Sequence, residues 1–142
     1  MAQSYRMTPA RRAVNAVFKF LVGLGMGPAN SRVLSVPGRR TGREYRAPVN
    51  LVMREGERYL VSPYGERGWT ANARAAGRVT LRRGGTTETV TLTELGPSEA
   101  APVLRQYAWE NAITRPFFDA GPESSEAEFA AEASRHPVFR LS

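Results

Sequence analysis

Cysteine is absent from this sequence, and histidine and lysine occur once each, as His136 and Lys19. The lack of cysteine excludes disulfide bonds, thiolate metal ligands and a thiol nucleophile, and it fits a cytoplasmic protein. A single histidine leaves little material for a multi-histidine metal centre or a Ser-His-Asp triad. We therefore expect no metal site, and we interpret His136 as a structural or surface residue.

Motifs for nucleotide chemistry are missing as well. A phosphate-binding loop for hydrolysis needs a lysine after its glycines, and Lys19 lies instead in the first predicted helix. No glycine fingerprint for a dinucleotide follows any predicted strand. The glutamates of residues 123–132 follow the pattern of a solvated helical face, so no paired carboxylates for acid–base catalysis are evident. The sequence therefore identifies no catalytic side chain.

The composition is that of one soluble domain with an uneven charge. Hydrophobic residues make up 42% and charged residues 23% of the 142 positions. The net charge is +7, and residues 1–43 contain seven arginines, one lysine and no acidic residue. Such a field attracts an anionic cofactor, anionic lipid or nucleic acid. No RNA-recognition or helix-turn-helix pattern is present, so we expect no nucleic-acid partner.

Residues 1–30 are predicted to form an amphipathic helix and a linker. Thr8 is a suitable N-cap with Pro9 at the first helical position, and glycines at 23, 25 and 27 end the helix. The helix is too short and too charged to span a bilayer, and it lacks a secretory cleavage site. We expect its apolar stripe to pack on the rest of the domain; the alternative is peripheral contact with an anionic membrane. The stripe consists of Ala10, Ala13, Val14, Val17, Phe18 and Leu21, with Arg11, Arg12, Asn15 and Lys19 on the other face.

The remaining chain is predicted to alternate between short strands and helices. Apolar alternation and turn residues favour strands over residues 33–36, 48–53, 58–62, 78–83 and 86–95, and residues 138–141 can close the sheet as an edge strand, which gives five or six strands. Helical spacing favours helices over residues 69–76, 98–110 and 126–134, the last with a capping box from Ser125 and Glu128. This order fits a single α+β domain over residues 1–142, built on a small antiparallel barrel with an N-terminal helix and peripheral C-terminal helices.

The segment between the first two strands, residues 38–43, is rich in glycine and arginine, and we call it the arginine loop. It reads Gly38-Arg39-Arg40-Thr41-Gly42-Arg43. The glycines allow a turn in which successive N–H groups converge, and guanidinium groups bind oxyanions through paired hydrogen bonds. A solvated basic turn is the alternative interpretation.

A second segment follows the strand that ends near Ser62, and it joins the arginine loop in a family pattern. It continues through Tyr64-Gly65 into a short helix reading Trp69-Thr70-Ala71-Asn72-Ala73-Arg74-Ala75. Together with the strand that starts at Pro48, these elements resemble the deazaflavin-dependent nitroreductase family, whose members bind coenzyme F420 on a split β-barrel. The resemblance extends along the chain to the closing residues 136–140.

The resemblance implies an FMN-binding-like split barrel and an oxidoreductase that transfers a hydride from reduced F420 to a small organic acceptor of the quinone, nitroaromatic or enone type. The cofactor then performs the chemistry, which suits a chain poor in catalytic side chains. The implied cofactor contacts are Arg39, Arg40, Thr41 and Gly42 for the anionic tail, Tyr45, Ala47 and Pro48 along the linker and ring, Ser62, Pro63, Tyr64, Gly65 and Trp69 around the ring, and Asn72 and Arg74 in support.

The acceptor is less closely specified. Asn50 stands where an aromatic residue is expected from the family, and the loop before Trp69 is short. Candidates for the substrate pocket are Asn50, Tyr107, Trp109 and Phe117. For each of the three aromatic residues, the alternative is a place in the hydrophobic core. Two other classes of function stay open: a barrel that binds FMN, FAD or haem, and a non-catalytic module for an anionic ligand or membrane surface. The assembly is predicted to be a monomer or homodimer.

Overall fold

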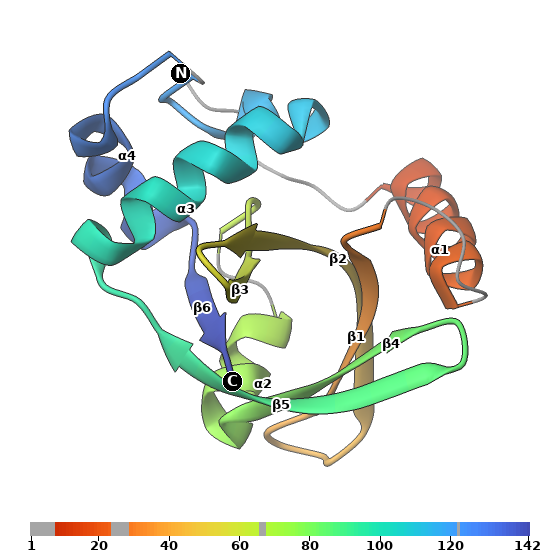
Figure 1. Cartoon of the computed structure of the whole chain (residues 1–142). Coiled ribbons are helices and arrows are strands. Elements are labelled where there is room, and N and C mark those ends of the chain that lie inside the picture. The colour runs from red at the N-terminus through yellow and green to blue at the C-terminus, as the bar shows by residue number, and fades with distance from the viewer. Residues whose placement is uncertain (1–7, 24–28, 66–67, 122) are drawn as a thin grey trace.

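The computed structural model describes residues 8–23, 29–65, 68–121 and 123–142 (Figure 1). Six strands in this part of the chain close into an antiparallel barrel in the order β1-β2-β3-β6-β5-β4. Their bounds are β1 Ser31–Pro37, β2 Glu44–Arg54, β3 Glu57–Val61, β4 Arg78–Arg83, β5 Thr86–Glu94 and β6 Val138–Leu141. The expected antiparallel barrel is confirmed, with six strands where five or six are expected. Strand β6 is not the expected edge strand, because it pairs with both β3 and β5.

The largest difference from the predicted strands lies around the arginine loop. Strand β2 begins at Glu44, so Pro48 lies inside the strand and does not start it. The extra residues continue the ladder with β1, where Val36 pairs with Tyr45 and Val33 pairs with Pro48. The arginine loop is therefore a short connection at the end of a long two-stranded ladder.

The helices lie around the barrel (Figure 1). Their bounds are α1 Pro9–Gly23, α2 Gly68–Ala76, α3 Pro97–Glu110 and α4 Glu126–Glu132, with short 3-10 helices η1 Ala112–Phe117 and η2 Ala133–Arg135. The predicted caps are present: Thr8 Oγ1 accepts a hydrogen bond from the N–H of Arg11 at 3.1 Å, and Ser125 with Glu128 forms a capping box. No helix in the described ranges is long and apolar enough to cross a membrane.

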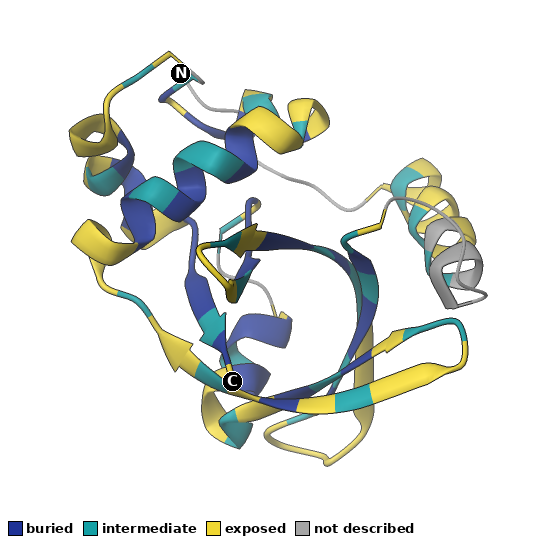
Figure 2. Cartoon of the chain, viewed as in Figure 1, coloured by how far each residue is buried: buried dark blue, intermediate teal, exposed yellow. Residues whose placement is uncertain are grey.

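Apolar side chains gather in two clusters on either side of the sheet that carries β3 and β6 (Figure 2). The first fills the barrel with alternate strand residues such as Leu34, Leu51 and Leu81, and Trp69 of α2 packs against it. The second lies between the barrel wall and the helices α3 and α4, with Leu104 and Phe129 fully buried. Helix α2 thus contributes to the barrel core, whereas α3 and α4 form an outer layer.

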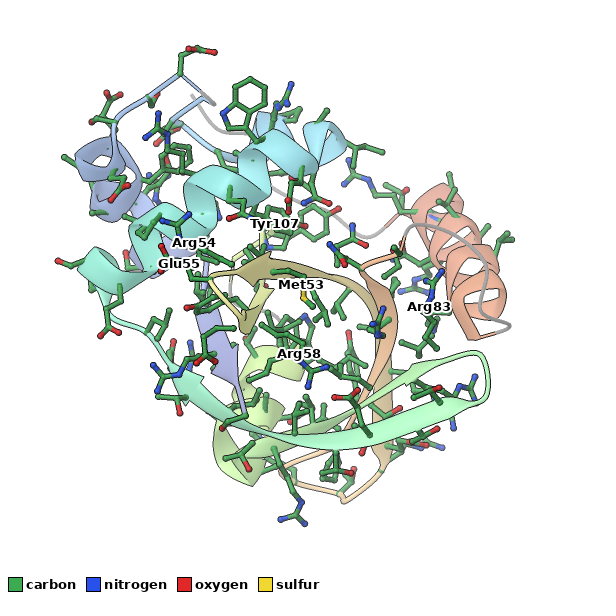
Figure 3. All side chains as sticks on the ribbon, viewed as in Figure 1. Met53, Arg54, Glu55, Arg58, Arg83 and Tyr107 are labelled. Carbon is green, nitrogen blue, oxygen red and sulfur yellow. The ribbon has the colours of Figure 1, made fainter. Side chains whose placement is uncertain are left out.

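At one end of the barrel, charged side chains occupy the inward-facing positions of the strands. Arg58 lies inside the ring of strands (Figure 3) and forms an ion pair of 2.6 Å with Glu88. The hydrogen bond from Arg58 lowers the pKa of Glu88 below its ordinary value. Nearby, Arg32 and Arg83 both donate to the carbonyl oxygen of Ser31. These contacts satisfy polar groups at the barrel end opposite α2.

Two expectations about burial are wrong. Val14 and Val17 of the apolar stripe are 66% and 59% exposed, so these positions do not pack on the barrel; Phe18 and Leu21 lie outside the described side chains. Glu132 was expected on a solvated face but is only 2% exposed. It follows Phe129 by three residues on α4, and this spacing places both on the buried face.

Candidate functional site

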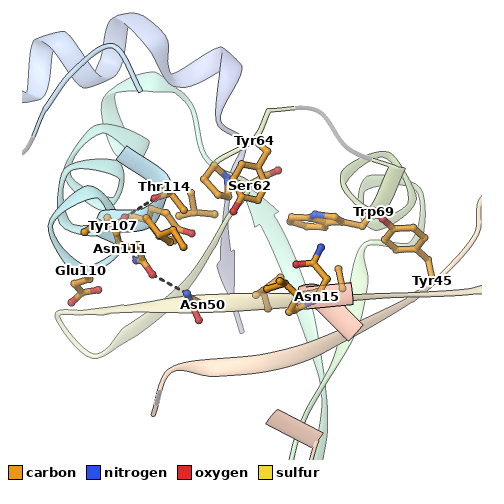
Figure 4. Close-up of a pocket in the computed structure, with 18 residues that line it drawn as sticks. Asn15, Tyr45, Asn50, Ser62, Tyr64, Trp69, Tyr107, Glu110, Asn111 and Thr114 are labelled. Atoms are coloured by element: carbon orange, nitrogen blue, oxygen red, sulfur yellow. Dashed lines mark hydrogen bonds between the residues drawn. The ribbon is translucent and has the colours of Figure 1, made fainter. Parts of the chain in front are cut away.

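A pocket of about 440 Å³ opens beside the barrel, between β2, the turn after β3, α2, the end of α3 and η1 (Figure 4). Its walls come from segments far apart in the sequence, and two regions of the lining can be distinguished. We call the end formed by Tyr45, Tyr64 and Trp69 the aromatic half. The end formed by Asn50, Tyr107, Glu110, Asn111 and Thr114 is the polar half. The volume and mixed lining are typical of a small-molecule site.

The aromatic half is held by packing against the barrel core. Trp69 is the second residue of α2 and is 6% exposed, with its ring 6.2 Å from that of Phe139. Tyr64 packs edge-on against Phe117 at 4.9 Å, so Phe117 supports the wall from outside the lining. Tyr45 is 39% exposed at the end next to the arginine loop. These three rings offer flat surfaces on which a planar group can stack.

The polar half is an ordered set of hydrogen bonds. Asn50 Nδ2 donates to Asn111 Oδ1 at 2.8 Å, and Ser31 donates to Asn50 Oδ1 at 2.6 Å. Asn111 Nδ2 donates in turn to the carbonyl of Tyr107 at 3.0 Å, and Thr114 Oγ1 donates to the carbonyl of Asn111 at 2.8 Å. The amides of Asn50 and Asn111 are thus fixed in orientation by their partners.

Tyr107 is buried behind these amides, at 4% exposure. Burial raises the pKa of its phenol well above the ordinary value of 10.0, and a side-chain hydrogen bond with Thr114 counteracts part of that effect. The phenol is therefore protonated at neutral pH. It presents a neutral wall to the pocket.

The arginine loop is stabilised mainly by its own backbone. Gly38 N–H donates to Arg43 O at 2.7 Å, Gly42 N–H donates to Gly38 O at 2.9 Å, and Arg43 N–H donates to Thr41 Oγ1 at 3.2 Å. Gly42 has a φ of 72°, which glycine adopts without strain. The N–H groups of these residues therefore do not converge on a ligand, and exposed guanidinium groups remain as the anion-binding feature of the loop.

Helix α2 connects the arginine loop to the pocket. The buried amide of Asn72 accepts two hydrogen bonds from Arg39 at its Oδ1, from the backbone N–H at 3.0 Å and from Nη1 at 2.9 Å. Trp69 and Asn72 are one turn apart on the same helix face. The loop is thus fixed one helical turn from the aromatic half.

Nine of the candidate residues line the pocket: Tyr45, Ala47, Pro48, Asn50, Ser62, Pro63, Tyr64, Trp69 and Tyr107. Arg39, Arg40, Thr41 and Gly42 lie in the arginine loop outside the lining, and Gly65 and Asn72 are also outside the lining. Arg74 pairs with Glu94 through two bonds of 2.7 and 2.8 Å, outside the lining. Trp109 is 57% exposed and also lies outside the lining.

Several lining residues were not among the predicted site residues. Val14 and Asn15 of α1 reach one edge, and Glu110, Ala112 and Ile113 come from the end of α3 and from η1. Asn50 and Asn111 are 61 positions apart, and no local spacing predicts that pairing. The segment after α3 could have been noticed because Asn111 ends the helical periodicity and an unpatterned stretch with Ile113 and Pro116 follows.

His136 and Glu132 form a buried pair behind the pocket wall. Glu132 Oε1 is 2.7 Å from His136 Nε2, and Pro63 O is 2.8 Å from His136 Nδ1. Of the two roles expected for His136, structural or surface, its 3% exposure fits the structural one. The described residues contain no group of three or more His, Cys, Asp or Glu side chains arranged for a metal ion.

Comparison with known proteins adds a family and a fold. A family model described as F420H(2)-dependent quinone reductase matches residues 9–115. The search of curated proteins gave no match. One similar solved structure is an F420-H2 dependent reductase, FDR-A, 21% identical, with a TM-score of 0.49 and coverage of 80% of this chain and 94% of that chain.

Two further structures carry the fold likeness. A protein of unknown function from Agrobacterium tumefaciens is 16% identical, with a TM-score of 0.56 and coverage of 95% of this chain and 56% of that one. A protein from Bacteroides thetaiotaomicron, described as a putative 5-nitroimidazole antibiotic resistance protein, is 12% identical, with a TM-score of 0.51 and coverage of 89% and 77%. The expected fold class, a small antiparallel barrel with an N-terminal helix and peripheral C-terminal helices, is confirmed.

Proposed function

Since the chain belongs to the F420H(2)-dependent quinone reductase family, we propose that it reduces a small organic acceptor of the quinone, nitroaromatic or enone type with reduced coenzyme F420. The observation that supports this most strongly is the position of the pocket. A flat aromatic half lies one helical turn from a loop of exposed arginines. A planar ring with an anionic tail requires these two features next to each other.

We assign the deazaflavin ring to the aromatic half. Trp69, Tyr45 and Tyr64 supply surfaces for stacking, and Ala47 and Pro48 leave room along β2. Ser62 and Pro63 form the backbone wall between them. Stacking on these surfaces would shield the faces of the ring from water, which protects a hydride donor from side reactions.

The anionic tail is assigned to the arginine loop. Arg39, Arg40 and Arg43 are exposed there, and Arg46 is held by Glu44 at 2.9 Å on the adjoining strand. Guanidinium groups bind phosphate and carboxylate oxygens through charge-assisted hydrogen bonds. In this assignment Asn72 orients Arg39, and Arg74 supports the helix from its ion pair with Glu94.

The acceptor is assigned to the polar half. Each side-chain amide has two N–H donors, and Asn50 and Asn111 each use one of them within the network. The second can donate to a carbonyl or nitro oxygen, a group that all three acceptor types contain. Bound F420H2 supplies a hydride, and one proton from water completes the two-electron reduction of a quinone to its quinol while the cofactor is oxidised.

Binding of F420, FMN and FAD to the same protein tests this proposal. A Trp109→Phe background leaves Trp69 as the sole tryptophan, because the sequence contains two. F420 should quench Trp69 emission and bind more tightly than either flavin. A Trp69→Phe variant that retains Trp109 is the matched control and should show little quenching. Equal or tighter binding of FMN would favour a flavin-binding barrel over the deazaflavin enzyme.

We further propose that the enzyme is cytoplasmic and that it can contact an anionic membrane through α1. The supporting observation is that Val14 and Val17 are exposed, and that Val14 lines the pocket together with Ile113, which is 85% exposed. An apolar rim next to a site for a lipophilic acceptor suits contact with lipid. Vesicle binding that falls with rising salt would support it.

A further inference from the structure

The buried pair of His136 and Glu132 joins three segments that are distant in sequence. His136 contacts Glu132 in α4 and the carbonyl of Pro63 in the turn after β3. Glu132 also accepts backbone hydrogen bonds from Asp119 at 3.1 Å and from Ala120 at 2.7 Å. The ring of Phe118 stacks on the imidazole at a centroid distance of 4.1 Å. Such a fully bonded buried network fixes the relative position of its segments.

The partners of His136 determine where its protons lie. A carbonyl oxygen only accepts, so Nδ1 carries a hydrogen that it donates to Pro63. One further proton lies between Nε2 and the Glu132 carboxyl group, and the pair is neutral overall whichever atom holds it. Since the carbonyl of Pro63 cannot relay a proton, the pair cannot serve as an acid or base in the pocket. Its influence must pass through the backbone.

That backbone forms the pocket wall. Ser62, Pro63 and Tyr64 line the pocket, and residues 135–137 brace them from behind. Ser62 N–H donates to Pro137 O at 2.9 Å, and Ser62 Oγ donates to Gly65 O at 2.6 Å. Gly65 has a φ of 87°, and a Cβ there would lie 3.2 Å from a carbonyl of the same brace.

We propose that His136 is a positioning residue for cofactor binding: its hydrogen bond to Pro63 sets the wall against which the deazaflavin ring lies. This inference rests on the proposed function. The proposal assigns a different effect to each of the two hydrogen bonds of the imidazole. The bond to Pro63 determines affinity, whereas the bond to Glu132 contributes to stability because it satisfies a buried carboxyl group.

Two substitutions test these two hydrogen bonds separately. The amide nitrogen of His136→Asn falls near the position of Nδ1 and can donate to Pro63, whereas that of His136→Gln falls near Nε2 and can donate to Glu132. In F420 titrations we expect His136→Gln to raise the Kd about tenfold and His136→Asn to change it by less than about threefold. The melting temperature should fall more in His136→Asn. Arg54→Gln removes an ion pair with Glu55 at the turn between β2 and β3, outside the pocket lining and the brace, and should leave the Kd unchanged.

The reverse order of affinities, or equal affinities in folded Asn and Gln variants, would overturn the inference. Amide exchange at Tyr64 and Gly65 without ligand gives a second readout: faster exchange in the Gln variant than in the Asn variant supports it, and equal exchange contradicts it. Wild-type protein that fails to bind F420 rejects the proposed function, while the exchange comparison still tests the brace. If a variant does not fold, the wild-type protein provides the test, because it contains a single imidazole that 15N NMR can follow. The Nδ1 signal should shift when F420 binds, and a signal that does not move argues against the proposal.

Discussion

Replacing Arg40 by alanine tests the arginine loop as the binding site of the anionic tail. Arg40 is exposed, and the hydrogen bonds that hold the loop run through its neighbours Gly38, Gly42 and Arg43, so the loop conformation should persist. A charge-assisted hydrogen bond contributes about 1.5–3 kcal/mol when well formed. Solvent screening at an exposed loop reduces this to about 1 kcal/mol. We therefore expect the Kd for F420 to rise by roughly fivefold to tenfold.

Arg39 should behave differently, because its backbone and its guanidinium both donate to Asn72. Arg39→Ala removes a contact to the tail and also loosens the loop from α2. The double variant should weaken F420 binding by about two orders of magnitude. Arg78→Ala, at an exposed position at the start of β4, removes the same charge from the protein and serves as the control for the long-range field.

The assay is a fluorescence titration with F420 at low and high salt, with the fold of each variant checked by circular dichroism. Loss of a contact lowers affinity at both salt concentrations, whereas loss of a diffuse field is screened as the salt rises. A folded Arg39→Ala, Arg40→Ala variant that binds F420 as tightly as the wild type would refute the assignment. The loop would then be a solvated basic turn.

Three further predictions concern the pocket and its rim. Glu110→Gln removes a negative charge from the pocket, so kcat/KM for an anionic naphthoquinone sulfonate should rise a few-fold relative to that for neutral naphthoquinone, which is roughly 0.5–1 kcal/mol. An unchanged ratio of the two kcat/KM values would show that Glu110 does not select the acceptor. The raised pKa of Tyr107 means that the folded state keeps a proton which the unfolded state loses above pH 10.0, so stability should decline as pH rises beyond that value. Tyr107→Phe should make this decline shallower in thermal melts from pH 9 to 11, and identical slopes would count against the buried phenol as its source. The substitutions Val14→Asp and Val17→Asp should abolish binding to anionic vesicles with little loss of stability, because both side chains are exposed; a large fall in melting temperature would instead show that they are buried.

Most of the barrel could be predicted from the sequence because each strand shows its own alternation. In β4, Val79 and Leu81 are both buried while Arg78 and Arg82 are exposed, as a two-residue period requires. Capping residues located the helices for a similar reason, since a cap acts within one turn. These signals are local, and tertiary packing did not override them.

The polar half of the pocket could not be predicted in that way. The bond between Asn50 and Asn111 depends on where α3 ends relative to β2, which is a property of packing and not of spacing. The internal hydrogen bonds of the arginine loop were also not predictable, because glycine spacing allows a turn without deciding which carbonyls its N–H groups meet. Glu132 is the exception among the missed residues. Its place three residues after Phe129 and four before His136 indicated the buried side of α4.

The spacing of Trp69 and Asn72 has a physical reason in this structure. A separation of three residues puts both side chains on the face of α2 that meets the barrel, where Trp69 walls the pocket and Asn72 holds Arg39. A shift of one residue in either would turn its side chain by about 100° around the helix. The aromatic half and the arginine loop would then lose their common support. One helical turn therefore couples the surface proposed for the ring to the charges proposed for the tail, and this coupling explains how two weak motifs become informative as a pair.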